Sequence, residues 1–406
     1  MSSRHIAVAI PAMDELATLP ATLADLAAQT LPSFRLYVCV NQPDSWWHDG
    51  DAAHRAVCRR NADLLRALEP WRQRLSLTVV DCSSPSLGWP PRRQGVGWAR
   101  KRLFDAIVRE LPADALVVSL DADTRVDADY LRRLALTFDR HPDWAALSVP
   151  YYHRLSGDEG IDRPLLRYEC YMRHYLLQLL AIRDTLAASA HVPFPYAFTA
   201  IGSAMAFTCR AYLRCGGITP LQGGEDFYLM QKFAKTGHVG LFLEGGDADY
   251  IPLFPSGRIS RRVPFGTGPA VAMTVADQAA RYPFFAPSAF DAVADTYACF
   301  PALYERDIDT PMTPFLQRQL ATDDLWGPLR RNHTTCDRFV HACIERVDGL
   351  RILQYLRTCP DGVLPDSAVA DFQNASVAEL DTFRNALLQK EMTQRNNKIP
   401  KPALTN

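Results

Sequence analysis

The sequence predicts an α/β protein: a mostly parallel sheet with helices on both faces, followed by a helical C-terminal region. Over the first 125 residues, short apolar runs alternate with stretches of helical periodicity, and this alternation is lost after about residue 275. Apolar strands separated by helices are typical of a parallel sheet that is buried on both faces. Because 406 residues are more than one core usually serves, we expect two parts, residues 1–275 and 276–406.

The spacing of apolar residues gives the individual elements. Thr18 is a candidate N-cap for the first helix. The segment after residue 197 predicts a strand, a short helix, a glycine-rich turn, a helix and a strand. The expected strands of the first part cover residues 5–11, 35–40, 75–80 and 115–120, and the expected helices cover residues 18–30, 51–69, 96–111 and 160–190. Residues 276–406 show helical patterns without strand alternation, and residues 393–406 are expected to fray.

Composition excludes several classes of protein. Lys and Arg (44) balance Asp and Glu (45), so no general field attracts nucleic acid or an anionic membrane. The first residues do not resemble a signal peptide, and no window offers the ~18 uncharged apolar residues of a membrane span, which leaves at most peripheral membrane contact. Ten cysteines without a C-x-x-C pair indicate reduced thiols in a cytoplasmic protein.

Polar side chains follow each expected strand of the first part. In open parallel α/β sheets, ligands bind beyond the carboxyl ends of the strands. The residues at those ends are acid-rich, as a site for a polar ligand and a cation requires. They are residues 11–15, 41–44, 81–84 and 121–123.

The tripeptide Asp-Ala-Asp occurs three times. Asp121 and Asp123 follow a buried strand and, on an extended chain, share one face, where a divalent cation would relieve their repulsion. The alternative is a strand-ending Asx-turn with two solvated acids. The second copy, residues 127–129, suits the start of a helix with Asp127 as its N-cap. The third, residues 247–249, is expected to be a pair of loop acids near a strand.

Five motifs in order resemble the family 2 glycosyltransferases, which have a GT-A fold. The resemblance covers about the first 265 residues; the helical region shows none. The motifs are Pro11 to Glu15 (with Asp14 where the family has Asn), Asn41 after the second strand, Arg100 in "WARK", the D-x-D of Asp121 and Asp123, and Gly216-Gly217 followed by Glu225-Asp226.

The resemblance implies a set of roles. Asp226 would be the catalytic base of an inverting transfer. Asp121 and Asp123 would hold Mn²⁺ or Mg²⁺, with Asp121 also reaching the ribose. Pro11, Glu15, Asn41 and Arg100 would face the nucleotide, although Asn in place of the family's acid leaves the base open. The implied reaction moves a hexose from a nucleoside-diphosphate sugar, by family preference a UDP-sugar, to a hydroxyl of a glycan, a lipid-linked acceptor or a small molecule, in carbohydrate biosynthesis.

The roles of Asp226 and of the arginine-rich residues 258–270 have alternatives on the sequence alone. Asp226 lies at the start of a helix, where the dipole favours an acid and keeps its pKa low, so a raised pKa would require burial beside substrate. Residues 258–270 carry three arginines; Arg261 and Arg262 are the best candidates to fold over a diphosphate, and a basic surface loop is the alternative.

Two other functions remain open. A nucleotidyltransferase that makes sugar nucleotides also uses an α/β sheet, but such enzymes usually carry a glycine-rich loop after the first strand, and residues 11–20 contain no glycine. A catalytically silent binding protein could keep the fold, although it would tolerate loss of the base or of the metal acid, and this chain has both Asp226 and Asp123.

Overall fold

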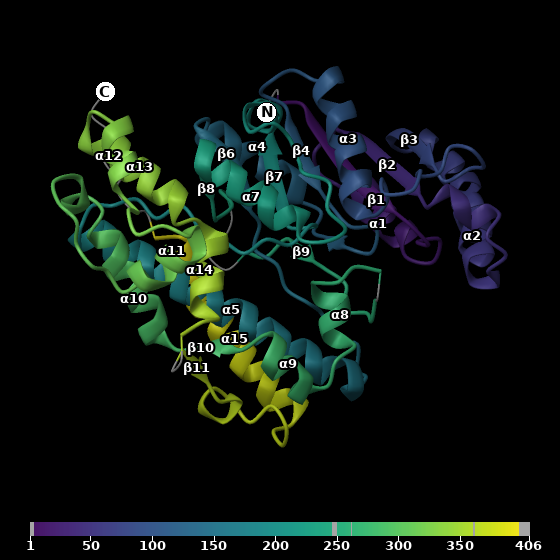
Figure 1. Ribbon diagram of the computed structural model, residues 1–406. Coiled ribbons are helices and arrows are strands. Elements are labelled where there is room, and N and C mark those ends of the chain that lie inside the picture. The colour runs from purple at the N-terminus through teal and green to yellow at the C-terminus, as the bar shows by residue number, and fades with distance from the viewer. Residues whose placement is uncertain (1–3, 246–249, 261, 360–361, 398–406) are drawn as a thin grey trace. The chain divides into compact units, whose positions relative to one another are not determined.

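The computed structural model describes residues 4–245, 250–260, 262–359 and 362–397 (Figure 1). The third Asp-Ala-Asp copy and Arg261 lie outside the described residues. The chain divides into two compact units. The first comprises Met1–Leu165 and Thr199–Met273, and the second comprises Leu166–Phe198 and Thr274–Asn406. The sequence had placed residues 166–198 in the first part, and this difference is explained below.

A seven-stranded sheet forms the centre of the first unit, in the order β3-β2-β1-β4-β7-β6-β8. Strands β1, β2, β3 and β4 are parallel to one another, β6 and β8 are parallel, and β7 is antiparallel to both of its neighbours, β4 and β6. The strands are β1 (Ile6–Ala12), β2 (Arg35–Asn41), β3 (Ser76–Cys82), β4 (Leu116–Ser119), β6 (Trp144–Ser148), β7 (Met205–Thr208) and β8 (His238–Gly240). This confirms the predicted fold class.

Helices and two short strands complete the first unit. The helices are α1 (Leu19–Ala27), α2 (Ala52–Leu68), α3 (Val96–Glu110), α4 (Tyr130–Arg140), α6 (Cys209–Arg214), α7 (Glu225–Thr236) and α8 (Thr267–Val271), with 3₁₀ turns at Asp44–Trp47 and Glu69–Gln73. Strands β5 (Arg125–Val126) and β9 (Leu253–Phe254) pair as a small antiparallel sheet. Helix α4 begins at Tyr130, and its N-cap residue is Asp129 rather than Asp127. The Asp127 side chain accepts a hydrogen bond from the backbone N–H of Asp129.

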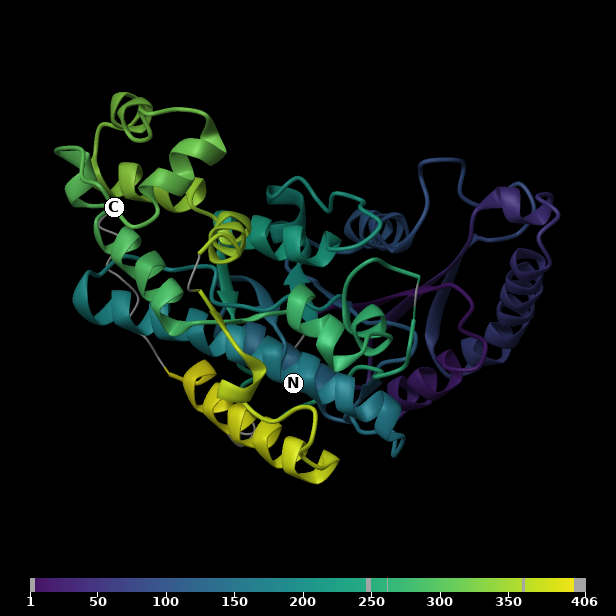
Figure 2. The ribbon, with the colours of Figure 1, turned by 60° about the horizontal axis from the view of Figure 1, so that its bottom comes forward.

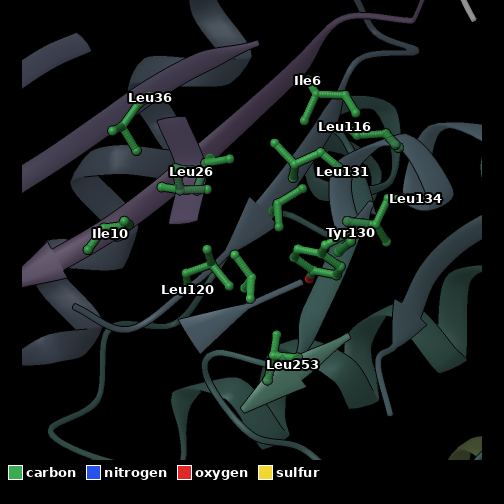
Figure 3. Packing of buried hydrophobic residues seen from close by; sticks show 14 of the residues in the cluster. Ile6, Ile10, Leu26, Leu36, Leu116, Leu120, Tyr130, Leu131, Leu134 and Leu253 are labelled. Carbon is green, nitrogen blue, oxygen red and sulfur yellow. The ribbon is translucent and has the colours of Figure 1, made fainter. Parts of the chain in front are cut away.

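Alternate residues of the strands fill a hydrophobic core on one face of the sheet. Figure 3 shows Ile6 and Ile10 of β1, Leu36 of β2 and Leu116 of β4 packed with side chains from the neighbouring helices. Tyr130, Leu131 and Leu134 of α4 and Leu26 of α1 supply that helical layer. On the opposite face, α3 buries Ala99, Leu103, Phe104 and Ile107. Both faces are covered, as the almost uninterrupted apolar strands predict.

The second unit is mostly helical. Its helices are α5 (Glu159–Ser189, which begins in the first unit), α9 (Val275–Arg281), α10 (Pro287–Ala298), α11 (Thr313–Leu320), α12 (Gly327–Asn332), α13 (Cys336–Arg346), α14 (Gly349–Leu356) and α15 (Val377–Arg395). Two short strands, β10 (Phe284–Phe285) and β11 (Val363–Leu364), form an antiparallel pair that the sequence did not predict. The 3₁₀ turns are Ala302–Tyr304 and Asp366–Ala368.

Buried ion pairs explain why most of α5 belongs to this unit. Figure 2 shows α15, in yellow, beside α5. Arg173 of α5 pairs with Glu391 of α15 at 2.7 Å, and Arg384 of α15 pairs with Glu169 of α5 at 3.0 Å. All four side chains are at most 2% exposed. Burying charges is costly unless they are paired, so these pairs favour the packing of α5 on α15 within the second unit.

Two findings bear on the cell-biological expectations. No helix among the described residues is long and apolar enough to cross a membrane. All ten cysteines, from Cys39 to Cys359, are free thiols.

Candidate functional site

The parallel strands bring their acid-rich ends to one edge of the sheet. In the register of β1 with β4, Ala9 lies opposite Ser119, so Glu15 and Asp121 both follow strand ends at this edge. Strand β7 begins there as well, because Met205 pairs with Ser119. His238 lies at the opposite edge, where it pairs with Trp144 at the start of β6.

Arg100 connects the D-x-D acids with the Glu-Asp pair. Its guanidinium Nη2 is 2.5 Å from Asp121 Oδ1, and Nη1 donates a hydrogen bond to Glu225 Oε1. The side chains of Arg100 and Glu225 are 4% and 2% exposed. The guanidinium group of Arg100 thus links the residue that follows β4 to the first residue of α7, because it pairs with an acid from each. The sequence placed Arg100 against the nucleotide; the structure shows it paired with acids, and contact with a ligand stays a prediction.

Two close approaches of backbone fix the position of Arg100. A Cβ atom on Gly202 would lie 2.2 Å from Nη2 of Arg100. The absence of a side chain at Gly202 therefore lets the loop before β7 pass close to the guanidinium group. A Cβ atom on Gly97, in the first turn of α3, would lie 2.2 Å from the carbonyl oxygen of Leu221. The loop that precedes α7 therefore rests directly on the first turn of the helix that carries Arg100.

Asp226 has a raised pKa. Burial of the carboxyl group is the largest cause, and the charge of Glu225 adds to it; together they raise the pKa of Asp226 to about 7, although Arg100 and the backbone N–H of Phe227 act in the opposite direction. The Phe227 N–H donates to Asp226 Oδ1 at 2.8 Å. The sequence analysis expected a rise only beside bound substrate. The protein alone produces it, because desolvation outweighs the favourable helix terminus.

Asp121 and Asp123 are neutralised by different arginines. Asp121 pairs with Arg100, and burial, partly offset by that arginine, raises the pKa of Asp121. Asp123 Oδ2 accepts a hydrogen bond from Arg258 Nε at 2.6 Å. Each carboxylate therefore gives one oxygen to a guanidinium group. Arg258, 135 residues along the chain from Asp123, was not singled out from the sequence.

Arg258 and Arg262 both contact the loop that follows β1. Arg258 Nη2 donates to Glu15 Oε1, and Arg262 Nη1 lies 2.5 Å from the same oxygen. Arg262 Nη1 also donates to the carbonyl oxygen of Met13. Glu15 is buried and accepts a further hydrogen bond from the hydroxyl of Thr18. Thr18 is the N-cap residue of α1, but its hydroxyl bonds to Glu15 instead of capping the backbone of α1. The structure thus brings the predicted Glu15 and Arg262 together.

Asp14 and Asn41 have structural partners. Asp14 adopts a left-handed backbone with φ 62°, and its carboxylate pairs with Arg60, whose hydrogen bond lowers the pKa of Asp14. Asn41, 3% exposed, donates to the carbonyl oxygen of Ala12 at 3.0 Å and accepts from the indole of Trp89 at 3.1 Å. Its amide joins β1 to the loop after β3, and contact with a base stays a prediction.

Pro11 is a buried residue of β1 opposite Cys39, so it lies in the sheet rather than beyond its end. A role for Pro11 beside the nucleotide also stays a prediction. The second Asp-Ala-Asp copy is structural, as expected. Asp129 pairs with Arg132 at 2.5 Å and accepts a hydrogen bond from Thr30.

The acids fit a cation that arrives with a phosphate ligand. Among the described residues, no three His, Cys, Asp or Glu side chains form a group that could hold a metal on their own. Mg²⁺ is commonly bound by one or two carboxylates together with substrate phosphates and water, rather than by a cage of protein ligands. Asp121 and Asp123 can supply that number of carboxylates.

No protein-family model and no curated protein matches the sequence. Solved structures that are similar to it include S. aureus TarS 1–349 in complex with UDP-GlcNAc, with 12% identity, 97% of this chain and 90% of that chain covered, and a TM-score of 0.40. Another is the mannosyltransferase PcManGT from Pyrobaculum calidifontis in complex with GDP-Man and Mn²⁺, with 14% identity, 96% and 85% covered, and a TM-score of 0.36. At such low identities and scores, the likeness carries no argument about function.

Proposed function

We propose that this protein is an inverting, metal-dependent glycosyltransferase. It would move a hexose from a nucleoside-diphosphate sugar, preferably a UDP-sugar, to a hydroxyl acceptor. The observation that carries the proposal is the single buried Arg100 that pairs with Asp121 on one side and with Glu225 on the other. The charges of Arg100 and Asp121 both act on Asp226, whose pKa is about 7, and this supports a cation site and a base in the same region.

Asp226 is the proposed general base. A base works best when its pKa lies near the operating pH, and such a base typically contributes ~10²–10⁴-fold to the rate. At neutral pH, a substantial fraction of Asp226 is ionised and can take the proton of the acceptor hydroxyl as it attacks the sugar. Attack from the side opposite the leaving group inverts the anomeric centre, by analogy with inverting hydrolysis.

The other side chains of the site stabilise the leaving diphosphate. A Mn²⁺ or Mg²⁺ ion bound by Asp121 and Asp123 would supply charge stabilisation to its oxygens. The guanidinium groups of Arg258 and Arg262 carry donors suited to phosphate oxygens. Arg100 keeps the strand tip and the base at a fixed separation, which favours a preorganised site.

The test is release of nucleoside diphosphate from a panel of sugar nucleotides that includes UDP-GlcNAc and GDP-Man, with Mn²⁺ and a set of hydroxyl acceptors. We expect Asp226→Asn to keep donor binding and to lose transfer by ~10²–10⁴-fold. We expect Asp123→Ala to weaken metal-dependent donor binding. The matched control is Asp129→Asn. This acid belongs to the second Asp-Ala-Asp copy, and its partners are Arg132 and Thr30.

Three results would contradict the proposal. Transfer by Asp226→Asn at the parent rate would show that another group is the base. Release of pyrophosphate from a nucleoside triphosphate and a sugar phosphate would favour a nucleotidyltransferase. Tight donor binding without any transfer across the acceptor panel would favour a silent binding protein.

A further inference from the structure

Arg258 pairs with two acids from different loops, Asp123 after β4 and Glu15 after β1. Its Nε lies 2.6 Å from Asp123 Oδ2, and its Nη2 donates to Glu15 Oε1. Glu15 and Asp123 are 5% and 18% exposed at their side chains, so both charges are largely removed from water. A single guanidinium group thus compensates the acid after β1 and the last acid of the D-x-D motif.

A divalent cation at Asp123 would compete with this guanidinium group. Oδ1 of Asp123 belongs to the same carboxylate that Arg258 contacts through Oδ2, so a metal ion at Oδ1 would lie close to a second positive charge. Like charges that close repel strongly where water is partly excluded. Metal binding therefore favours departure of Arg258 from Asp123.

The segment that carries Arg258 has few apolar anchors. No described residue from 256 to 269 is buried, and Ile259 and Phe265 are 52% and 55% exposed. Arg258 and Arg262 both pair with Glu15 of the loop after β1. Segments with few buried apolar contacts move at low free-energy cost. Arg258 can therefore exchange its partners without disruption of the core.

We propose that Arg258 is an internal counter-ion of Asp123 that a divalent cation displaces and that then binds the diphosphate of the donor. This inference rests on the proposed function for the identity of the phosphate ligand. A bound diphosphate offers the displaced guanidinium group new acceptor oxygens in place of Asp123. Cation and donor consequently bind cooperatively, and each raises the affinity of the other by the same factor.

The test measures binding of Mn²⁺ alone, by electron paramagnetic resonance, to the parent and to Arg258→Gln. Without the guanidinium group, the variant should bind Mn²⁺ about tenfold more tightly, within the usual range of such couplings. Arg258→Lys keeps the charge and should stay near the parent. Adding Asp123→Asn to Arg258→Gln should abolish the gain.

The matched control is Arg132→Gln, which removes a guanidinium group from Asp129 in the second Asp-Ala-Asp copy and should leave Mn²⁺ affinity unchanged. A second measurement adds UDP: Mn²⁺ affinity of the parent should rise by a larger factor than that of Arg258→Gln. Equal Mn²⁺ affinity of the parent and Arg258→Gln, or an equal gain in Arg132→Gln, would overturn the inference. If neither UDP nor GDP bound the parent, the proposed function would fail, while the measurement with Mn²⁺ alone would still decide the role of Arg258.

Discussion

Replacement of Asp226 by Asn should stabilise the folded protein, and more at pH 8 than at pH 5. A carboxyl group whose pKa is raised by folding binds its proton more tightly in the folded state. As the pH rises from the ordinary pKa of 3.8 to about 7, the folded state therefore loses stability relative to the unfolded state, and above pH 7 the penalty is constant. The groups that act on Asp226 are Glu225, Asp121 and Arg100. Asn removes the penalty because it carries no charge.

The size of the effect follows from the two pKa values. Each pH unit between them corresponds to about 1.4 kcal/mol. The ionised group would destabilise the folded protein by at most about 4 kcal/mol at pH 8 and about 2 kcal/mol at pH 5. Because water reaches part of the side chain and screens its charge, these figures are upper limits. For a domain of the size of the first unit, a difference of about 2 kcal/mol corresponds to roughly 4–8 °C in Tm.

The assay is a thermal melt of the parent and of Asp226→Asn at pH 5 and pH 8. Asp129→Asn is the control with the opposite sign, since hydrogen bonds from Arg132 and Thr30 lower the pKa of Asp129 to about 2. That control should lower Tm at both pH values. If the gain in Tm of Asp226→Asn were the same at pH 5 and pH 8, the raised pKa and the burial that causes it would be refuted.

Three further predictions concern the same region. The kcat/KM for transfer should rise with pH, reach half of its plateau near pH 7 and level off above it, as Asp226 loses its proton; a flat profile between pH 5 and 8 would contradict its role as base. Arg100→Met should lower the free energy of unfolding by about 3–5 kcal/mol, measured by denaturant titration, because it leaves Glu225 buried and unpaired. Gly97→Ala should cost about 1–3 kcal/mol and slow transfer, because the new Cβ atom meets the backbone of Leu221; unchanged stability would mean that the loop yields freely.

The sequence predicted most of the first unit because its elements are locally encoded. The apolar run at residues 5–11 became β1 (Ile6–Ala12), and the helical spacing of residues 96–111 became α3 (Val96–Glu110). Neighbouring parallel strands then bring the acids that follow them to one edge. Arg100 pairs with both Asp121 and Glu225, while the joint role of these acids in one active site stays a prediction.

Other features depend on contacts between distant residues. Helix α5 shows an ordinary helical pattern, whereas its contacts with distant residues, such as Arg173 with Glu391 and Arg167 with Asp366, lie within the second unit. Nothing local distinguishes Arg258 from Arg262, yet only Arg258 contacts Asp123. The pKa of Asp226 depends on burial, which sequence spacing does not report.

The reversed direction of β7 has a consequence for how this edge of the sheet can change. At this edge, the loops of the parallel strands follow the strands, whereas residues 199–204 precede the antiparallel strand β7. The Gly202 carbonyl oxygen there accepts a hydrogen bond from Ser119 at 2.6 Å. Insertions or deletions in this entry loop could remodel the surroundings of Arg100 while every parallel crossover keeps its length, so diversity among related chains should concentrate there.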